Sequence, residues 1–174
     1  MAQPSSVSNY RQQSFGLSLV KTWLFVAVSD ALFASATGIL IAPYASPARV
    51  FRGVASVLLG KGAMTGGAGT ALVGLGMHFC VALFWSFLFV TAVRNSAALS
   101  RAIASWPTAI LVASIYGVSI WLIMTWIVIP SMLHRPPNLS LKYWVQLVGH
   151  IPFVVMPMVL VNRRDAAARV SRST

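Results

Sequence analysis

Four long apolar segments constrain this 174-residue chain more than any other feature of its sequence. The segments cover about residues 17–42, 70–93, 107–130 and 143–161. Each has about the 20 residues that cross a hydrocarbon core of about 30 Å as a helix. They are too long for membrane-spanning strands and lack the alternation of such strands. The sequence therefore predicts an all-α membrane protein, a four-transmembrane-helix bundle over 17–162 that forms a single domain.

The composition agrees with this fold class. Only 9% of the residues are charged, whereas about a quarter are charged in an average soluble domain. The net charge of +11 arises from Lys and Arg at the ends of the apolar segments, without the interleaved aromatic residues of a nucleic-acid surface. We therefore expect the lipid bilayer, and no nucleic acid, as a partner. The distribution of basic residues predicts that both termini are cytoplasmic.

Polar or amphipathic segments flank and join the apolar ones. Residues 1–16 are predicted to form a loose polar tail, and residues 163–174 a basic C-terminal tail. Between the first two segments, Ser46 and Pro47 predict the start of a short helix over about 47–59. Its apolar residues recur at helical spacing, so we expect an amphipathic helix that lies in the outer interface or folds back over the bundle. Three cations are the candidates for lipid head-group contacts: Arg49, Arg52 and Lys61.

Small residues recur every fourth position along the apolar segments. In lipid, helices associate where small side chains let their backbones approach closely. The first and second transmembrane helices are therefore predicted to pack tightly through these stripes, and the third helix carries a similar one. The helix-packing candidates are Ala34, Gly38, Thr70, Gly74, Ala82 and Gly117.

Ionisable residues within the apolar segments define the candidate polar site. From the outer ends of the helices, His78 and His150 lie at about 10–12 Å depth and Asp30 at about 18 Å. Gln146 is a shallower polar neighbour, and Tyr116 lies near the level of Asp30. Charged groups cost about 2.5–3.5 kcal/mol to place inside a membrane on insertion scales, so they usually have partners. We predict that Asp30, His78 and His150 approach one another inside the bundle.

Three interpretations of these residues remain open. An Asp30–His78 hydrogen bond can clamp the first two helices, with His150 bonded to a backbone carbonyl or to Gln146. The same residues can form a pathway for a proton or small cation. His78 and His150 are also candidate ligands of haem or a metal. Cys80 is expected to be a small buried apolar residue.

Three stretches resemble a group of bacterial membrane proteins. They are GLGMHFCVALFWSFLFV (74–90), YGVSIWLIMTWIVIP (116–130) and GHIPFVVMPMVLVNRR (149–164). Over about residues 20–165 the chain is similar to the YagU-like proteins, small and uncharacterised integral membrane proteins. The resemblance implies the bacterial inner membrane and a four-helix design. It implies no substrate and no catalytic residue.

The sequence favours a non-enzymatic membrane protein, since it contains none of the common catalytic or phosphate-binding motifs. The leading hypothesis is an intramembrane Asp/His site that handles a proton or small cation. The alternatives are an accessory or assembly subunit of a larger membrane complex and a bis-His haem or metal protein. The chain has no obvious inverted repeat from which a single copy could form an alternating-access transporter. We therefore expect a homo-oligomer or a larger membrane complex.

Overall fold

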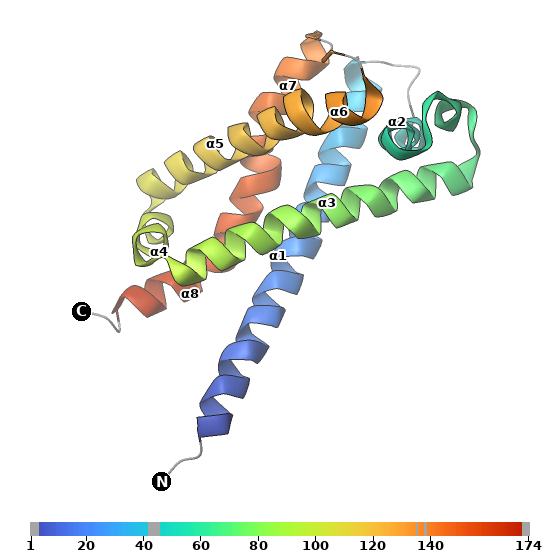
Figure 1. The fold of residues 1–174 in the computed structure, drawn as a ribbon. Coiled ribbons are helices and arrows are strands. Elements are labelled where there is room, and N and C mark those ends of the chain that lie inside the picture. Colours follow the sequence, from blue (N-terminus) through green and yellow to red (C-terminus); the bar gives the residue numbers. More distant parts are fainter. Residues whose placement is uncertain (1–3, 42–45, 135, 138, 172–174) are drawn as a thin grey trace.

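The computed structural model describes residues 4–41, 46–134, 136–137 and 139–171. Their secondary structure is entirely helical (Figure 1). Four stretches are long and apolar enough to cross a membrane: Phe15–Ile41, Ala68–Asn95, Trp106–Leu133 and Leu141–Ser171. The predicted all-α fold with four membrane-spanning helices is confirmed.

These stretches correspond to groups of helical elements. The first lies in α1 (Pro4–Ile41), and the second is α3 (Ala68–Asn95). The third joins α5 (Trp106–Leu122), η2 (Ile123–Val128) and α6 (Ile129–Leu133). The fourth joins α7 (Leu141–His150), η3 (Ile151–Val155) and α8 (Met156–Ser171).

The terminal segments differ from the sequence prediction. Residues 4–16, expected as a loose tail, are the first part of α1, and α8 continues through the basic segment to Ser171. Helix propagation from an existing helix costs little, and these segments contain no internal proline. The remaining residues of the two expected tails, 1–3 and 172–174, lie outside the described part of the chain. Residues 42–45, at the end of the first apolar segment, also lie outside it.

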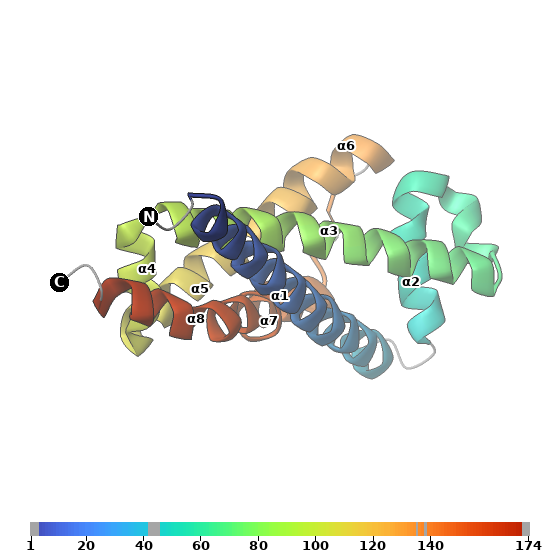
Figure 2. The same ribbon diagram turned by 90° about the horizontal axis from the view of Figure 1, so that it is seen from below.

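A further helix, α4 (Ala97–Ala104), connects the second and third spans. Ser96 caps it, because the Ser96 hydroxyl accepts a hydrogen bond from the Leu99 amide at 3.1 Å. Figures 1 and 2 show α4 and both chain ends toward one end of the molecule, with α2 (Pro47–Leu59) toward the other. We call these the terminal end and the α2 end.

The apolar core lies mainly on the terminal side of the predicted polar site. On α1 it contains Val26 and Ala27, which are 1% and 0% exposed. Residues of α3, α4, α5, η3 and α8 complete it, among them Phe89, Ile103, Ala113, Val155 and Met158. The core therefore joins all four spans near the terminal end.

Helix α2 begins as predicted but packs on the bundle. The Ser46 hydroxyl accepts from the Arg49 amide at 3.3 Å, and Pro47 occupies the first turn. Phe51, Ala55 and Ser56 of α2 are buried. Of the two predicted positions for this segment, the structure therefore favours the one folded back over the bundle.

The glycines of α1 and α3 accommodate α2. A Cβ atom at Gly74 would overlap the Phe51 carbonyl oxygen, and one at Gly38 would overlap the Val50 side chain. Both glycines are therefore helix-packing positions, and the helix that approaches them is α2. Because glycine has no side chain, it leaves room for a third helix to approach where only two were expected.

The other small residues lie at varied depths. Ala82 is buried in the core, whereas Ala34 and Thr70 are half-buried. Gly117 of α5 faces α7, since a Cβ there would lie 3.2 Å from the His150 carbonyl carbon and oxygen. The small-residue stripe of α5 thus packs against the last membrane span, with Ala109 and Ala113 fully buried.

Candidate functional site

Asp30 and His78 form the centre of the candidate site. His78 Nε2 lies 3.8 Å from Asp30 Oδ2 and 3.3 Å from the Ala27 carbonyl oxygen. Ala27 precedes Asp30 by about one helical turn, so the carbonyl and the carboxylate meet the same ring nitrogen. A carbonyl can only accept, and the contact therefore favours the tautomer in which Nε2 carries hydrogen. The predicted pairing of α1 with α3 through Asp30 and His78 occurs in this structure.

Aromatic rings surround the His78 imidazole. The centroid of Phe51, on α2, lies 5.9 Å from the imidazole centroid, and that of Phe79 lies 6.2 Å away. The His78 and Asp30 side chains retain 13% and 20% exposure. The pair therefore lies in a mostly apolar environment, in which an ionised group is stabilised chiefly by its partner.

The last span approaches Asp30 through the neighbours of that residue on α1. The Ser29 hydroxyl donates to the Phe153 carbonyl at 2.5 Å, and the Phe33 and Phe153 rings stack with centroids 4.5 Å apart. Gly149 leaves the space that the Phe33 ring occupies. Asp30 thus lies on a segment of α1 that contacts α3 through His78 and the last span through Ser29 and Phe33.

The hydrogen bond of His150 is local to its own helix. Its Nδ1 donates to the Gln146 carbonyl at 2.7 Å, within α7. The Trp121 ring lies against it, with centroids 6.4 Å apart. Among the residues that the structure describes, no hydrogen bond or ion pair joins His150 to Asp30 or His78, and Gln146 contributes its backbone oxygen to His150 alone.

Tyr116 belongs to a different contact. Its hydroxyl donates to the Trp85 carbonyl of α3 at 3.0 Å, and its ring packs on Trp85 and Phe89. The hydroxyl therefore connects α5 with α3. Its predicted place in the Asp30 site has no support from these contacts.

Metal binding requires several His, Cys, Asp or Glu side chains close together. Among the residues that the structure describes, no three His, Cys, Asp or Glu side chains form a group that could hold a metal ion. Asp30, His78 and His150 therefore do not form a three-ligand site. Cys80 is exposed on α3, and its predicted burial is wrong. In a membrane, an exposed apolar position faces lipid, and a small apolar thiol is compatible with that environment.

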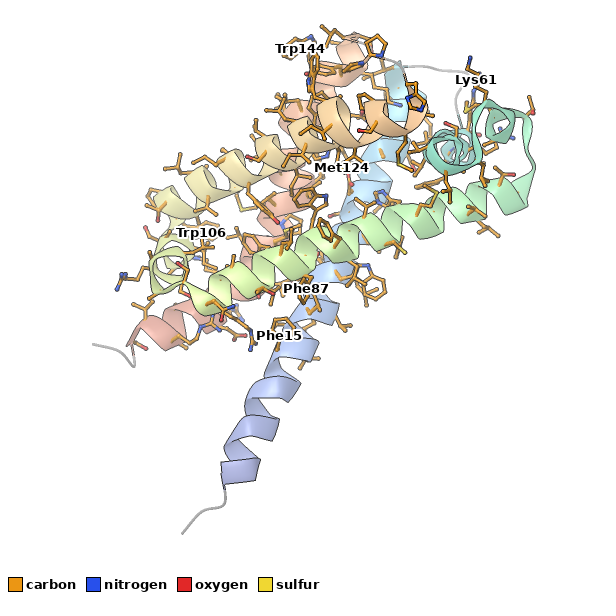
Figure 3. The ribbon with its side chains drawn as sticks, viewed as in Figure 1. Phe15, Lys61, Phe87, Trp106, Met124 and Trp144 are labelled. Carbon is orange, nitrogen blue, oxygen red and sulfur yellow. The ribbon has the colours of Figure 1, made fainter. Side chains whose placement is uncertain are left out.

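The three predicted head-group cations differ in their surroundings. Arg52 Nη1 donates to the Gly66 carbonyl at 2.6 Å, so this side chain connects α2 with the segment before α3. Arg49 and Lys61 are exposed. Figure 3 shows Lys61 and Trp144 toward the α2 end and Trp106 nearer the terminal end. Of these three cations, Arg49 and Lys61 are therefore the ones exposed for the predicted head-group contacts.

The sequence did not identify several polar contacts between helices. The most buried is between α1 and α8, where Asn162 Nδ2 donates to Thr22 Oγ1 at 2.8 Å. Arg163 Nε donates to the Ala104 carbonyl, and its guanidinium lies 3.9 Å from the centroid of Trp106. Asn162 lies just beyond the predicted end of the fourth apolar segment. The Asn162 side-chain amide at the end of an apolar segment could have indicated a polar contact between helices. Its partner, Thr22, depends on how α1 and α8 align.

No protein-family model, curated protein or solved structure matches this chain. The similarity to the YagU-like proteins therefore stays a prediction from the three stretches that carry it.

Proposed function

We propose that this chain is a multi-pass membrane protein whose Asp30–His78 pair binds and releases a proton within the bilayer. The observation that carries the proposal is the 3.8 Å approach of His78 Nε2 to Asp30 Oδ2 between two membrane-spanning helices. Asp30 is the only acidic residue of the four predicted apolar segments. The bacterial inner membrane, with both termini cytoplasmic, is the proposed location.

A carboxylate and an imidazole are suited to exchanging a proton. When the pair holds the additional proton, a positive imidazolium faces a negative carboxylate, or both groups are neutral. When the proton leaves, neutral His78 still donates from Nε2 to the Ala27 carbonyl, at 3.3 Å. Both states therefore keep a hydrogen bond, which lowers the cost of ionisable groups in the membrane.

The surroundings of the pair favour exchange from the α2 end. Toward the terminal end, Val26 and Ala27 on α1 and Val155 and Met158 on the last span are no more than 1% exposed. Such closely packed apolar side chains leave little room for water. Toward the other end the pair is covered by α2, which is not one of the four spans and contacts the imidazole through Phe51.

Proton flux into proteoliposomes tests the proposal. The purified protein is reconstituted with a pH-sensitive dye inside, and a potassium gradient with valinomycin sets the membrane potential. We expect flux above protein-free liposomes, and its loss in Asp30→Asn and in His78→Ala. Ser114→Ala is the control, because that half-buried hydroxyl donates within its own helix, to the Ile110 carbonyl. Flux that persists in both site variants would contradict transport through this pair.

Infrared difference spectroscopy tests proton binding without requiring transport. Spectra recorded as the pH is changed are expected to show the carbonyl stretch of a protonated carboxylic acid, and Asp30→Asn should remove that signal. Asp165→Asn removes the other acidic residue of the chain and should leave the signal in place. A signal that is absent from the wild type, or that depends on Asp165, would leave the pair as a helix clamp alone.

A further inference from the structure

A shallow apolar groove on the outer surface of the bundle is separate from the Asp30 site. It is lined by Leu24, Phe25 and Val28 of α1 and Val161 of α8, with Lys21 beside them. The groove surface is almost entirely apolar, so Lys21 contributes chiefly its methylene stem. The three α1 residues are about half exposed, which makes the groove accessible from the bilayer.

The depth of Lys21 corresponds to the boundary of the hydrocarbon core. The helix from Lys21 to Ile41 contains 21 residues, which extend over about 31 Å and match a core of about 30 Å. The ammonium group of Lys21 therefore reaches the level of lipid phosphates while its stem lies along the groove. From this level the groove extends toward the membrane interior for about 10 Å, to Val28.

The charges near the groove favour an anionic ligand. Lys21 is exposed, and Arg164, one turn beyond Val161 on α8, is exposed as well. Asp165 is adjacent, but it lies close enough to Arg94 to interact with that cation. An apolar groove that ends at a cation is complementary to an acyl chain joined to a phosphate.

We propose that this groove binds one anionic phospholipid, with an acyl chain along Leu24, Phe25, Val28 and Val161 and its phosphate at Lys21. The proposal is independent of proton binding by Asp30. A basic residue near a membrane surface contributes about 1 kcal/mol to attraction of anionic lipid, which corresponds to about a fivefold preference.

Native mass spectrometry of the detergent-purified protein tests this proposal. The protein is mixed with equal amounts of phosphatidylglycerol and phosphatidylcholine that carry the same acyl chains. We expect one phosphatidylglycerol to be retained preferentially, and Lys21→Gln to lower that preference about fivefold. Arg101→Gln is the control, since Arg101 is also an exposed cation but lies on α4 and does not line the groove.

Two further measurements separate the parts of the proposed ligand. Val28→Trp fills the inner end of the groove and is expected to reduce retention of phosphatidylglycerol while Lys21 is present. Glycerol phosphate, which lacks acyl chains, should not displace the lipid. Equal retention of both lipids, or a Lys21→Gln variant with wild-type preference, would overturn the proposal. Displacement by glycerol phosphate would also overturn it, by assigning Lys21 to a free phosphate.

Discussion

At the scale of single residues, two glycines of α3 differ sharply in their surroundings. A Cβ atom at Gly74 would overlap the Phe51 carbonyl of α2, whereas one at Gly76 meets nothing within 4 Å. Both lie in the same helix, so alanine has the same intrinsic helix preference at each. The difference between the two alanine variants therefore measures the contact between α3 and α2.

We expect Gly74→Ala to lower the free energy of unfolding by about 1–3 kcal/mol, because the backbone of α2 must move. Gly76→Ala should be neutral or slightly stabilising. Thermal unfolding in detergent measures both, and hydrogen exchange of the α2 amides should increase in Gly74→Ala alone. Equal stability of the two variants would contradict the packing of α2 on α3.

At the scale of elements, a hydroxyl of one helix supplies the hydrogen bond that a proline removes from another. Pro157 has no amide hydrogen, so the Phe153 carbonyl lacks its usual donor four residues later. Ser29 of α1 donates to this carbonyl at 2.5 Å. Within a membrane an unbonded carbonyl is costly, and this contact therefore joins α1 to the last span beside Asp30.

A double-mutant cycle tests this compensation. Ser29→Ala should cost about 0.6 kcal/mol of stability and at most about 1.7, the average and the maximum found for hydrogen bonds between membrane helices. Pro157→Ala restores an amide donor within the helix, so Ser29→Ala should cost much less in that background. The cycle is measured by unfolding in detergent, and identical costs in both backgrounds would refute the compensation.

At the scale of the whole molecule, the four spans place both chain ends and α4 toward one end, with α2 toward the other. Arg101 is part of α4 and therefore lies toward the terminal end, whereas Lys61 lies toward the α2 end. Both side chains are exposed. The proposed orientation therefore puts these two residues on opposite sides of the membrane.

Cysteine labelling tests the orientation. In a Cys80→Ser background, a membrane-impermeant maleimide should label Lys61→Cys in intact spheroplasts and Arg101→Cys only after lysis. The Cys80→Ser parent is the control for labelling of other proteins. Labelling of both positions from the same side would contradict the four-span topology, and the reverse pattern would invert the proposed orientation.

The sequence determined the number and type of spans, because run length and apolar composition are local properties that the bilayer constrains directly. It also located the start of α2 from Ser46 and Pro47, whose capping chemistry acts within a few residues. The approach of Asp30 to His78 was predicted from the small-residue stripes of the two helices and from approximate depth, since unpaired charges in a membrane are costly. Depth alone could not separate Tyr116 from that pair.

Only the tertiary structure decided which surfaces meet. Gly38 and Gly74 offered close approach to any helix, and the structure assigned that space to α2. The bonds of Ser29 to Phe153 and of Asn162 to Thr22 join positions more than a hundred residues apart. Such partners depend on the rotation and vertical alignment of whole helices, which residue spacing within one helix does not specify.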